Sequence, residues 1–174
     1  CATCCAMTIS TMKSRSKCSN FAIKFHNDRF YHQPFAGPQG IAVIFDKPST
    51  RTRSSFSIGV AELGGYPLVI DKSGSSWAVA NRWQTPHVLD RMAYGVVWRT
   101  FGQDRVEEMA KYSTHPVVNA LTDEFHPCQI LADFQTIAEH RGGVDNLKNQ
   151  TIAYLATRPT TCRTPICLVA PWPA

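Results

Sequence analysis

The sequence predicts an α/β fold in which a parallel sheet is flanked by helices. Two observations favour this class. From Gly40 onward, short apolar runs alternate with longer segments of helical periodicity, which is the pattern of repeated strand-helix units. The chain has 174 residues, which is enough for one well-cored domain and too few for two of ordinary size. We therefore expect one sheet with helices on its faces.

The apolar runs predict five strands, and the periodic segments between them predict helices. The first helix places Phe56, Val60 and Leu63 on one face and stops at the glycine pair 64–65. Strands are expected at residues 41–45, 67–70, 94–99, 115–119 and 151–155, with further helices around 106–110 and over 128–140. Three segments fit neither period: residues 1 to about 20, 76–86 and 157–174.

Composition and charge narrow the class of protein. The formal net charge is +5, and the basic residues are scattered, so a small anion accounts for them as well as a nucleic acid would. No stretch approaches the roughly 20 apolar residues that cross a bilayer. Residues 1–10 lack the order of a secretory signal, so we expect a cytoplasmic protein that binds neither membrane nor nucleic acid.

The seven cysteines predict neither a disulfide framework nor a metal site. Only Cys128 lies in the body of the chain, and the others are grouped near its two ends. Cys1, Cys4 and Cys5 are close together, but no second cysteine or histidine pair follows at zinc-site spacing.

A run of hydroxyl and guanidinium side chains follows the first predicted strand. Ser49, Thr50, Arg51 and Thr52 lie where this strand gives way to a helix. At such a junction the first helical amides are unpaired and carry the positive end of the helix dipole, so they bind phosphate. The hydroxyls add donors, and the arginine fork binds two oxygens together. Taken alone, the Ser-Thr pair would favour a simple helix cap over a phosphate site.

Two later strands end in polar side chains that we expect at the same edge. His126 and Gln129 are three residues apart where the strand at 115–119 gives way to the helix at 128–140, and Pro127 suits the first turn of this helix. Arg99 ends the strand at 94–99. Because the carboxyl ends of parallel strands meet at one edge, these side chains and Arg51 are predicted to converge. A lone histidine here would more often be structural.

These segments resemble the carbamoyltransferase family. The runs FDKPSTRTRSSF, VVWRTFG and FHPCQILADFQTI appear in the family's order and with family-like spacing. The cysteine in HPCQ and the following LAD resemble the ornithine branch, because the aspartate branch usually carries threonine at that cysteine. The similarity covers residues 28–155, apart from 76–86.

The resemblance implies carbamoyl transfer from carbamoyl phosphate to the side-chain amine of ornithine, giving citrulline and phosphate in arginine biosynthesis. The resemblance also implies a homotrimer, and a reaction that needs no metal or cofactor. Arg51 and His126 would be catalytic, stabilising the carbonyl oxygen together with Thr52. The carbamoyl phosphate ligands would be Ser49, Thr50, Arg51, Thr52, Arg99, His126 and Gln129.

Three elements of the family pattern are missing, and they fall in the three aperiodic segments. The Gln-Leu-Gly-Arg-Gly-Glu loop should follow Ser75, and a Gly-Asp-x-x-Asn-Asn motif should follow Leu155. The third is the remaining ornithine domain with the family's His-Cys-Leu-Pro motif. Plausible codons for residues 76–87 and 156–169, each read with one added base, restore the first two motifs, and residues 1–10 read two bases later resemble the family's opening. We hypothesise single-base frameshifts. A DNA sequence of the locus in which no such change restores the motifs would refute this.

We therefore expect an atypical N-terminal segment (1–27), a carbamoyl-phosphate-binding domain (28–150) and the start of a truncated ornithine domain (151–174). If the shifts are real, the chain is expected to bind carbamoyl phosphate at most, without turnover. Two alternatives stay open. The protein is a sister enzyme that uses aspartate or another amine such as putrescine or acetylated ornithine, or it is a non-catalytic phosphate-binding fragment.

Overall fold

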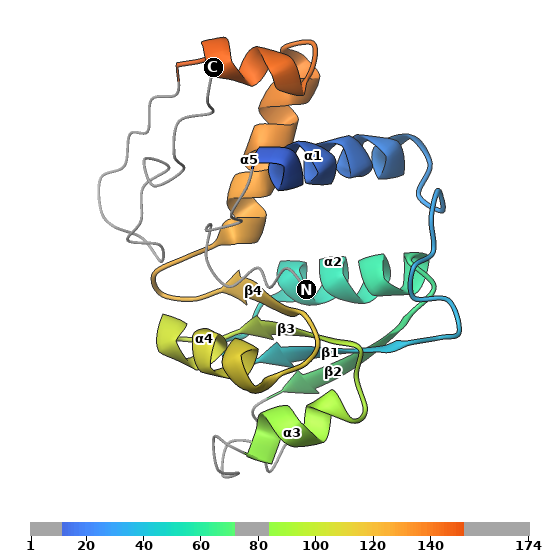
Figure 1. Cartoon of the computed structure of the whole chain (residues 1–174), viewed down its shortest axis with the longest axis vertical. Helices are drawn as coiled ribbons and strands as arrows, with labels where there is room; N and C mark the ends of the chain where they lie inside the picture. Colours follow the sequence, from blue (N-terminus) through green and yellow to red (C-terminus); the bar gives the residue numbers. More distant parts are fainter. Residues whose placement is uncertain (1–11, 72–83, 152–174) are drawn as a thin grey trace.

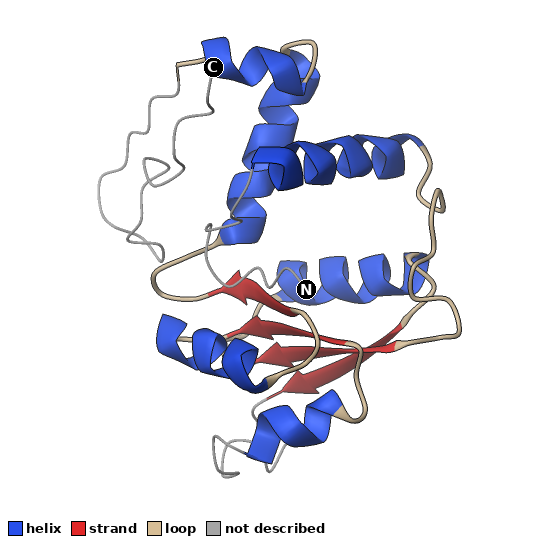
Figure 2. Cartoon of the chain, in the orientation of Figure 1, coloured by secondary structure: helices blue, strands red, loops and turns tan. Residues whose placement is uncertain are grey.

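The fold is a four-stranded parallel sheet with helices on both faces, as Figures 1 and 2 show. The structure is a computed structural model that describes residues 12–71 and 84–151. The strands are β1 (Gly40–Phe45), β2 (Tyr66–Asp71), β3 (Gly95–Arg99) and β4 (Val117–Leu121), in the spatial order β2-β1-β3-β4. The predicted fold class is confirmed. From residue 152 on, the predicted fifth strand lies outside the described residues.

The register of the sheet aligns the carboxyl ends of all four strands. Phe45, the last residue of β1, is level with Asp71 of β2 and with Arg99 of β3. Arg99 is in turn level with Leu121 of β4, across an irregularity at the end of that pair. Side chains that follow any of these strands therefore emerge along one edge of the sheet.

Helices cover the two faces unequally. Helix α2 lies on one face, and α3 and α4 lie on the other (Figure 1). Helix α2 ends where predicted, because Gly64 has a φ of 83°, a conformation that favours glycine. The helices are α1 (Met12–Asn27), α2 (Thr50–Glu62), α3 (Gln84–Asp90), α4 (Gln103–Tyr112) and α5 (Pro127–His140), followed by the 3-10 helix η3 (Val144–Asn149).

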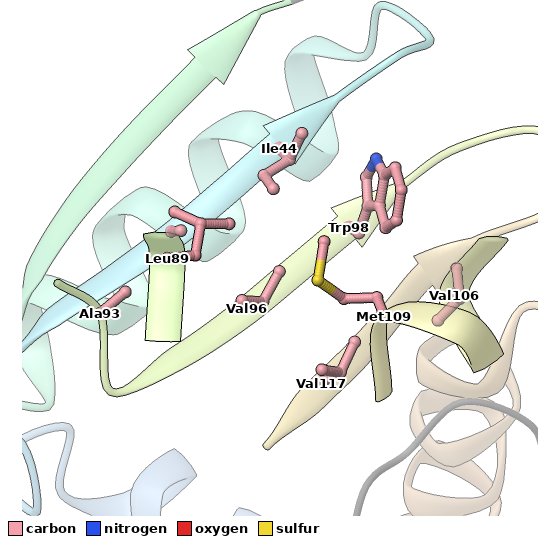
Figure 3. Close-up of a cluster of buried hydrophobic side chains, with 9 residues drawn as sticks. Ile44, Leu89, Ala93, Val96, Trp98, Val106, Met109 and Val117 are labelled. Carbon is pink, nitrogen blue, oxygen red and sulfur yellow. The ribbon is translucent and has the colours of Figure 1, made fainter. Parts of the chain in front are cut away.

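The sheet separates two apolar clusters. Figure 3 shows the cluster on the α3 and α4 side, where Leu89 and Met109 pack against alternate side chains of the strands such as Val96. The opposite cluster joins the remaining strand positions to Val60 of α2. Strand β1 contributes to both, since five of its six residues are buried. This explains why its sequence is continuously apolar rather than alternating.

Helices α1 and α5 and the 3-10 helix form a smaller third cluster away from the sheet. Ala138, Val144 and Leu147 are buried there, with Ile23 of α1 packed against them. Helix α1 lies across α5 in Figure 1. None of the helices in the described part of the chain is long and apolar enough to cross a membrane.

The structure corrects several predicted boundaries. Residues 12–20, which fitted neither period, belong to α1, and Ile23 of this helix packs against the third cluster. Residues 84–86, which also fitted neither period, begin α3, and residues 144–149 form the 3-10 helix η3. The fourth strand runs over 117–121 instead of 115–119, because Pro116 has no amide hydrogen to donate to the sheet.

Candidate functional site

The candidate site lies where neighbouring strands send their helices to opposite faces of the sheet. The chain leaves β1 for α2 on one face and leaves the adjacent β3 for α4 on the other. In open parallel sheets this divergence opens a crevice at the carboxyl ends of the strands, where ligands bind. The register places Phe45 and Arg99 side by side at this point.

A pocket of about 480 Å³ occupies this edge of the sheet. It brings together six of the seven predicted ligands, from the β1–α2, β3 and β4–α5 segments. Thr50 is the exception: it is the exposed first residue of α2 and is not in the pocket wall. The lining residues are Ser49, Arg51, Thr52, Ser55, Phe56, Arg99, Ala120, Leu121, His126, Cys128, Gln129 and Ala132.

The start of helix α2 is organised by Ser49. Its Oγ accepts a hydrogen bond from the amide of Thr52 at 3.3 Å and donates to Thr52 Oγ1 at 2.9 Å. The capping role that was the simpler alternative is therefore present. Ser49 also lies in the pocket wall. The first turn of α2 contains no acidic side chain, which would compete with a bound anion for the helix amides.

Arg99 and Arg51 place two positive charges on the same pocket. Burial lowers the pKa of Arg99 below its ordinary value, and repulsion from Arg51 lowers it further. The buried Nε of Arg99 has no hydrogen-bond partner within the described structure. Buried donors are normally satisfied, so an oxyanion between the two guanidinium groups would relieve both the repulsion and the unmet hydrogen bond.

His126 faces the same charges from the start of helix α5. Burial lowers the pKa of His126, the nearby Arg99 lowers it further, and Asp133 partly opposes them. The imidazole is therefore neutral at pH 7 and offers one N–H donor and one acceptor. Its buried Nδ1 makes no hydrogen bond in the part of the chain that the structure describes. Such a group can donate to a polarised carbonyl oxygen without adding a third cation.

Gln129 and Cys128 complete the α5 side of the pocket. Gln129 lies one turn beyond His126, and its Nε2 donates to Asp133 Oδ1 at 2.8 Å along the helix. The Sγ of Cys128 lies 3.5 Å from the carbonyl oxygen of Asn119. The amide oxygen of Gln129 is available to accept a hydrogen bond from a ligand amide.

Charged pairs behind the pocket tie its loops together, and the sequence reasoning missed them. Lys47, before the Ser49 turn, forms an ion pair with Asp123, before His126, and lies 4.5 Å from the ring centre of Phe101. Asp46 accepts hydrogen bonds from Thr100 Oγ1 at 2.5 Å and from Arg105 at 2.7 Å.

A signal for these pairs does exist in the sequence, because most of their members directly follow strand ends. Which of these side chains pair with each other could be seen only in the structure, because the partners are more than 50 residues apart in the sequence.

The described residues offer no cluster of three or more histidine, cysteine, aspartate or glutamate side chains that could hold a metal ion. What the pocket offers is positive charge, helix amides and neutral donors. These suit a phosphorylated small molecule that also carries a carbonyl group.

Comparison with known proteins identifies the family. The profile described as the carbamoyl-P binding domain of aspartate/ornithine carbamoyltransferase matches residues 7–139. The chain belongs to this family. The ornithine carbamoyltransferase of Bifidobacterium longum subsp. infantis is 86% identical over 138 residues, which are 77% of this chain and 42% of that protein. The chain thus spans about two fifths of the length of this carbamoyltransferase.

Solved carbamoyltransferases share the fold. Ornithine carbamoyltransferase from Thermus thermophilus superposes with a TM-score of 0.74 at 29% identity, covering 80% of this chain and 48% of that one. A variant of N-acetyl-L-ornithine transcarbamylase, solved with carbamyl phosphate and N-succinyl-L-norvaline, also gives 0.74, at 26% identity over 83% of this chain and 50% of its own.

Proposed function

We propose that the pocket at the strand ends binds carbamoyl phosphate, and that the complete protein transfers its carbamoyl group to the side-chain amine of ornithine. The products are citrulline and phosphate. One observation carries the proposal: Arg51, Arg99 and His126 come from three separate chain segments and line one pocket. High identity to an ornithine carbamoyltransferase supports the acceptor and a place in arginine biosynthesis.

In the proposed complex the phosphate lies against the start of helix α2. Its oxygens accept from the unpaired amides there, including that of Thr50, and from the hydroxyls of Ser49 and Thr52. The guanidinium groups of Arg51 and Arg99 neutralise its charge. This arrangement would satisfy the free Nε of Arg99, and it gives Thr50 a role through its backbone rather than through its exposed side chain.

The carbamoyl group then points toward helix α5. His126 donates to the carbonyl oxygen, and the Gln129 side-chain oxygen accepts from the carbamoyl amide. When the neutral amine attacks the carbonyl carbon, negative charge grows on that oxygen, where Arg51, Thr52 and His126 stabilise it. The bond from carbon to the phosphate oxygen breaks, and the amine loses a proton. No covalent enzyme intermediate, metal or cofactor takes part in the proposed reaction.

Orientation of the two substrates supplies much of the rate in this proposal. Fixed alignment of reacting groups is worth on the order of 7–11 kcal/mol in favourable cases. The acceptor is assigned from sequence identity, because the fold alone matches an ornithine enzyme and an N-acetyl-L-ornithine enzyme equally well. We further propose residues 28–150 as the carbamoyl-phosphate-binding domain of a cytoplasmic homotrimer, on the family resemblance stated above.

Calorimetric titration of the chain with fresh carbamoyl phosphate tests the binding step. Saturable binding is expected, lost in Arg51→Met and kept in Arg91→Met, which removes the same charge from the loop before β3 at the opposite edge of the sheet. Citrulline formation by the complete protein tests the acceptor. Turnover with aspartate or N-acetylornithine in place of ornithine would reassign it, and binding without turnover by the complete protein would make it a non-catalytic module.

A further inference from the structure

A group of polar side chains is buried beneath the turn that leads into His126. Gln103 is 7% exposed, and Asn119 and Thr122 are fully buried. They come from the start of α4, from β4 and from the turn after it. None of the three lines the pocket. Burying polar groups is costly unless they are hydrogen-bonded, so their arrangement needs an explanation.

The side-chain oxygen of Gln103 is the centre of this group. It accepts a hydrogen bond from Asn119 Nδ2 at 3.0 Å and another from Thr122 Oγ1 at 2.9 Å. The opposite end of the same amide donates to Glu107 one turn along α4, at 3.1 Å. This last bond fixes which way the amide is turned, so its oxygen must face β4 and the turn.

Thr122 closes the turn from both sides. Its amide donates to the carbonyl oxygen of Phe125 at 2.9 Å, and its Oγ1 accepts from the amide of Phe125 at 3.0 Å. The next residue is His126. The direction in which the chain enters α5, and therefore the place of the imidazole, depends on these two bonds.

Two further contacts hold the same turn against its neighbours. The amide of Gln103 donates to the Glu124 carboxylate at 3.1 Å, which joins the turn to the start of α4. The amide of Asp123 donates to the carbonyl oxygen of Phe101 at 2.8 Å, which continues the pairing of β3 with β4 beyond Arg99. The turn is thus fixed relative to the segment that carries Arg99.

We propose that Gln103, Asn119 and Thr122 form a positioning unit that fixes the His126 imidazole beside Arg99 in the pocket. Their role is to set direction. Apolar side chains of similar volume would fill the same space, but only hydrogen bonds of fixed direction define one orientation of the turn. The consequence for catalysis rests on the proposed function, whereas the consequence for the location of His126 does not.

The central test is Thr122→Val, which keeps the shape of the side chain and removes the hydrogen bonds of its hydroxyl to Gln103 and from the Phe125 amide, while the backbone bond of Thr122 stays. Thr122→Ser keeps the hydroxyl. Thr136→Val is the matched control, because the exposed Thr136 hydroxyl donates to the carbonyl oxygen of Ala132 within its own helix. The His126 ring is followed by NMR during a pH titration, with its signal assigned by loss in His126→Gln. Fresh carbamoyl phosphate, whose carbonyl oxygen is the proposed partner of His126, is titrated by calorimetry.

In Thr122→Val the imidazole is expected to leave its buried place beside Arg99, so its pKa rises toward about 6.5, the ordinary value for histidine. The affinity for carbamoyl phosphate is expected to fall about fivefold, the effect of losing the hydrogen bond from His126 to the carbonyl oxygen. Thr122→Ser should restore both readouts, and Thr136→Val should change neither. Gln103→Met keeps the internal bonds of the turn and the backbone bond to Glu124, and removes the side-chain links of Asn119 and Thr122 to α4, so it gives the same test if Thr122→Val fails to fold.

A wild-type titration of His126 in a folded Thr122→Val or Gln103→Met protein, with unchanged affinity for carbamoyl phosphate, would overturn the inference. Loss of folding in both variants together with wild-type behaviour of Thr122→Ala would do the same. The proposed function fails separately: if the wild-type chain binds no carbamoyl phosphate while the His126 titration responds to Thr122→Val as expected, the positioning unit stands and the substrate assignment does not.

Discussion

Replacing Arg99 by methionine should weaken anion binding without destabilising the empty domain. In the empty pocket Arg99 is partly buried, is repelled by Arg51 and leaves its Nε without a partner in the described structure. Methionine fills a similar space and bears no charge. Most substitutions of a buried side chain destabilise a protein, so unchanged or increased stability would be an unusual result with a specific cause.

The magnitude follows from the contacts that Arg99 would make with phosphate. Hydrogen bonds to charged groups are worth about 1.5–3 kcal/mol, and each 1.4 kcal/mol is tenfold in affinity. The phosphate dissociation constant of Arg99→Met should therefore rise roughly 10- to 100-fold. The midpoint of thermal unfolding without phosphate should stay level or rise, because the repulsion between the two arginines is gone.

Calorimetry with inorganic phosphate and thermal unfolding in a phosphate-free buffer measure the two effects. Arg91→Met is the control for loss of a positive charge, since Arg91 is exposed at the opposite edge of the sheet. The reasoning is refuted if Arg99→Met binds phosphate as the wild type does. It is also refuted if this variant unfolds several degrees lower while Arg91→Met does not, because Arg99 would then stabilise the fold.

Three more predictions follow from contacts around the pocket and beyond it. Lys47→Met removes the ion pair with Asp123 that joins two pocket loops, so phosphate affinity should fall several-fold. If the effects of Lys47→Met and Asp123→Asn on phosphate affinity simply add in the double variant, the ion pair does not contribute to binding. Ser49→Ala removes the cap of α2 and should cost about 1 kcal/mol of unfolding free energy by urea denaturation, with Ser49→Asn recovering most of it; equal losses would contradict the capping role. Desolvation by itself raises the pKa of Asp90, but hydrogen bonds from Thr114 and Ser113 outweigh it and lower the pKa from 3.8 to about 2. Because the folded pKa lies below the unfolded one, this contribution to stability is complete above the unfolded value and is lost as the pH falls toward about 2. Over this range the midpoint of thermal unfolding should drop more steeply with falling pH in the wild type than in Asp90→Asn. Parallel curves for the two proteins would argue against this role of Asp90.

The sheet and the location of the site follow from the sequence for a simple physical reason. Strands buried on both faces are written as continuous apolar runs, such as the one ending at Phe45, and polar residues placed directly after them must emerge at one edge. Arg51, Arg99 and His126 could therefore be predicted to converge, and they line one pocket. Their roles in binding remain predictions.

Other parts of the molecule could not be derived from local pattern. Among residues 17–27 of helix α1 only Ser19 is buried, and Ile23 packs against the third cluster, so this stretch gives no clear apolar period. The polar group around Gln103 depends on contacts between α4, β4 and the turn after it. Sequence spacing shows that Thr122 follows a strand, but only the three-dimensional structure shows which side chain its hydroxyl meets.

The most direct test of the proposed site is a crystal structure of this chain with phosphonoacetamide, in which a methylene group replaces the bridging oxygen of carbamoyl phosphate. The phosphonate should lie against the first turn of α2, between Arg51 and Arg99, with the carbonyl oxygen within hydrogen-bonding distance of His126. A ligand bound elsewhere, or a phosphonate here with its carbonyl directed away from His126, would contradict the account.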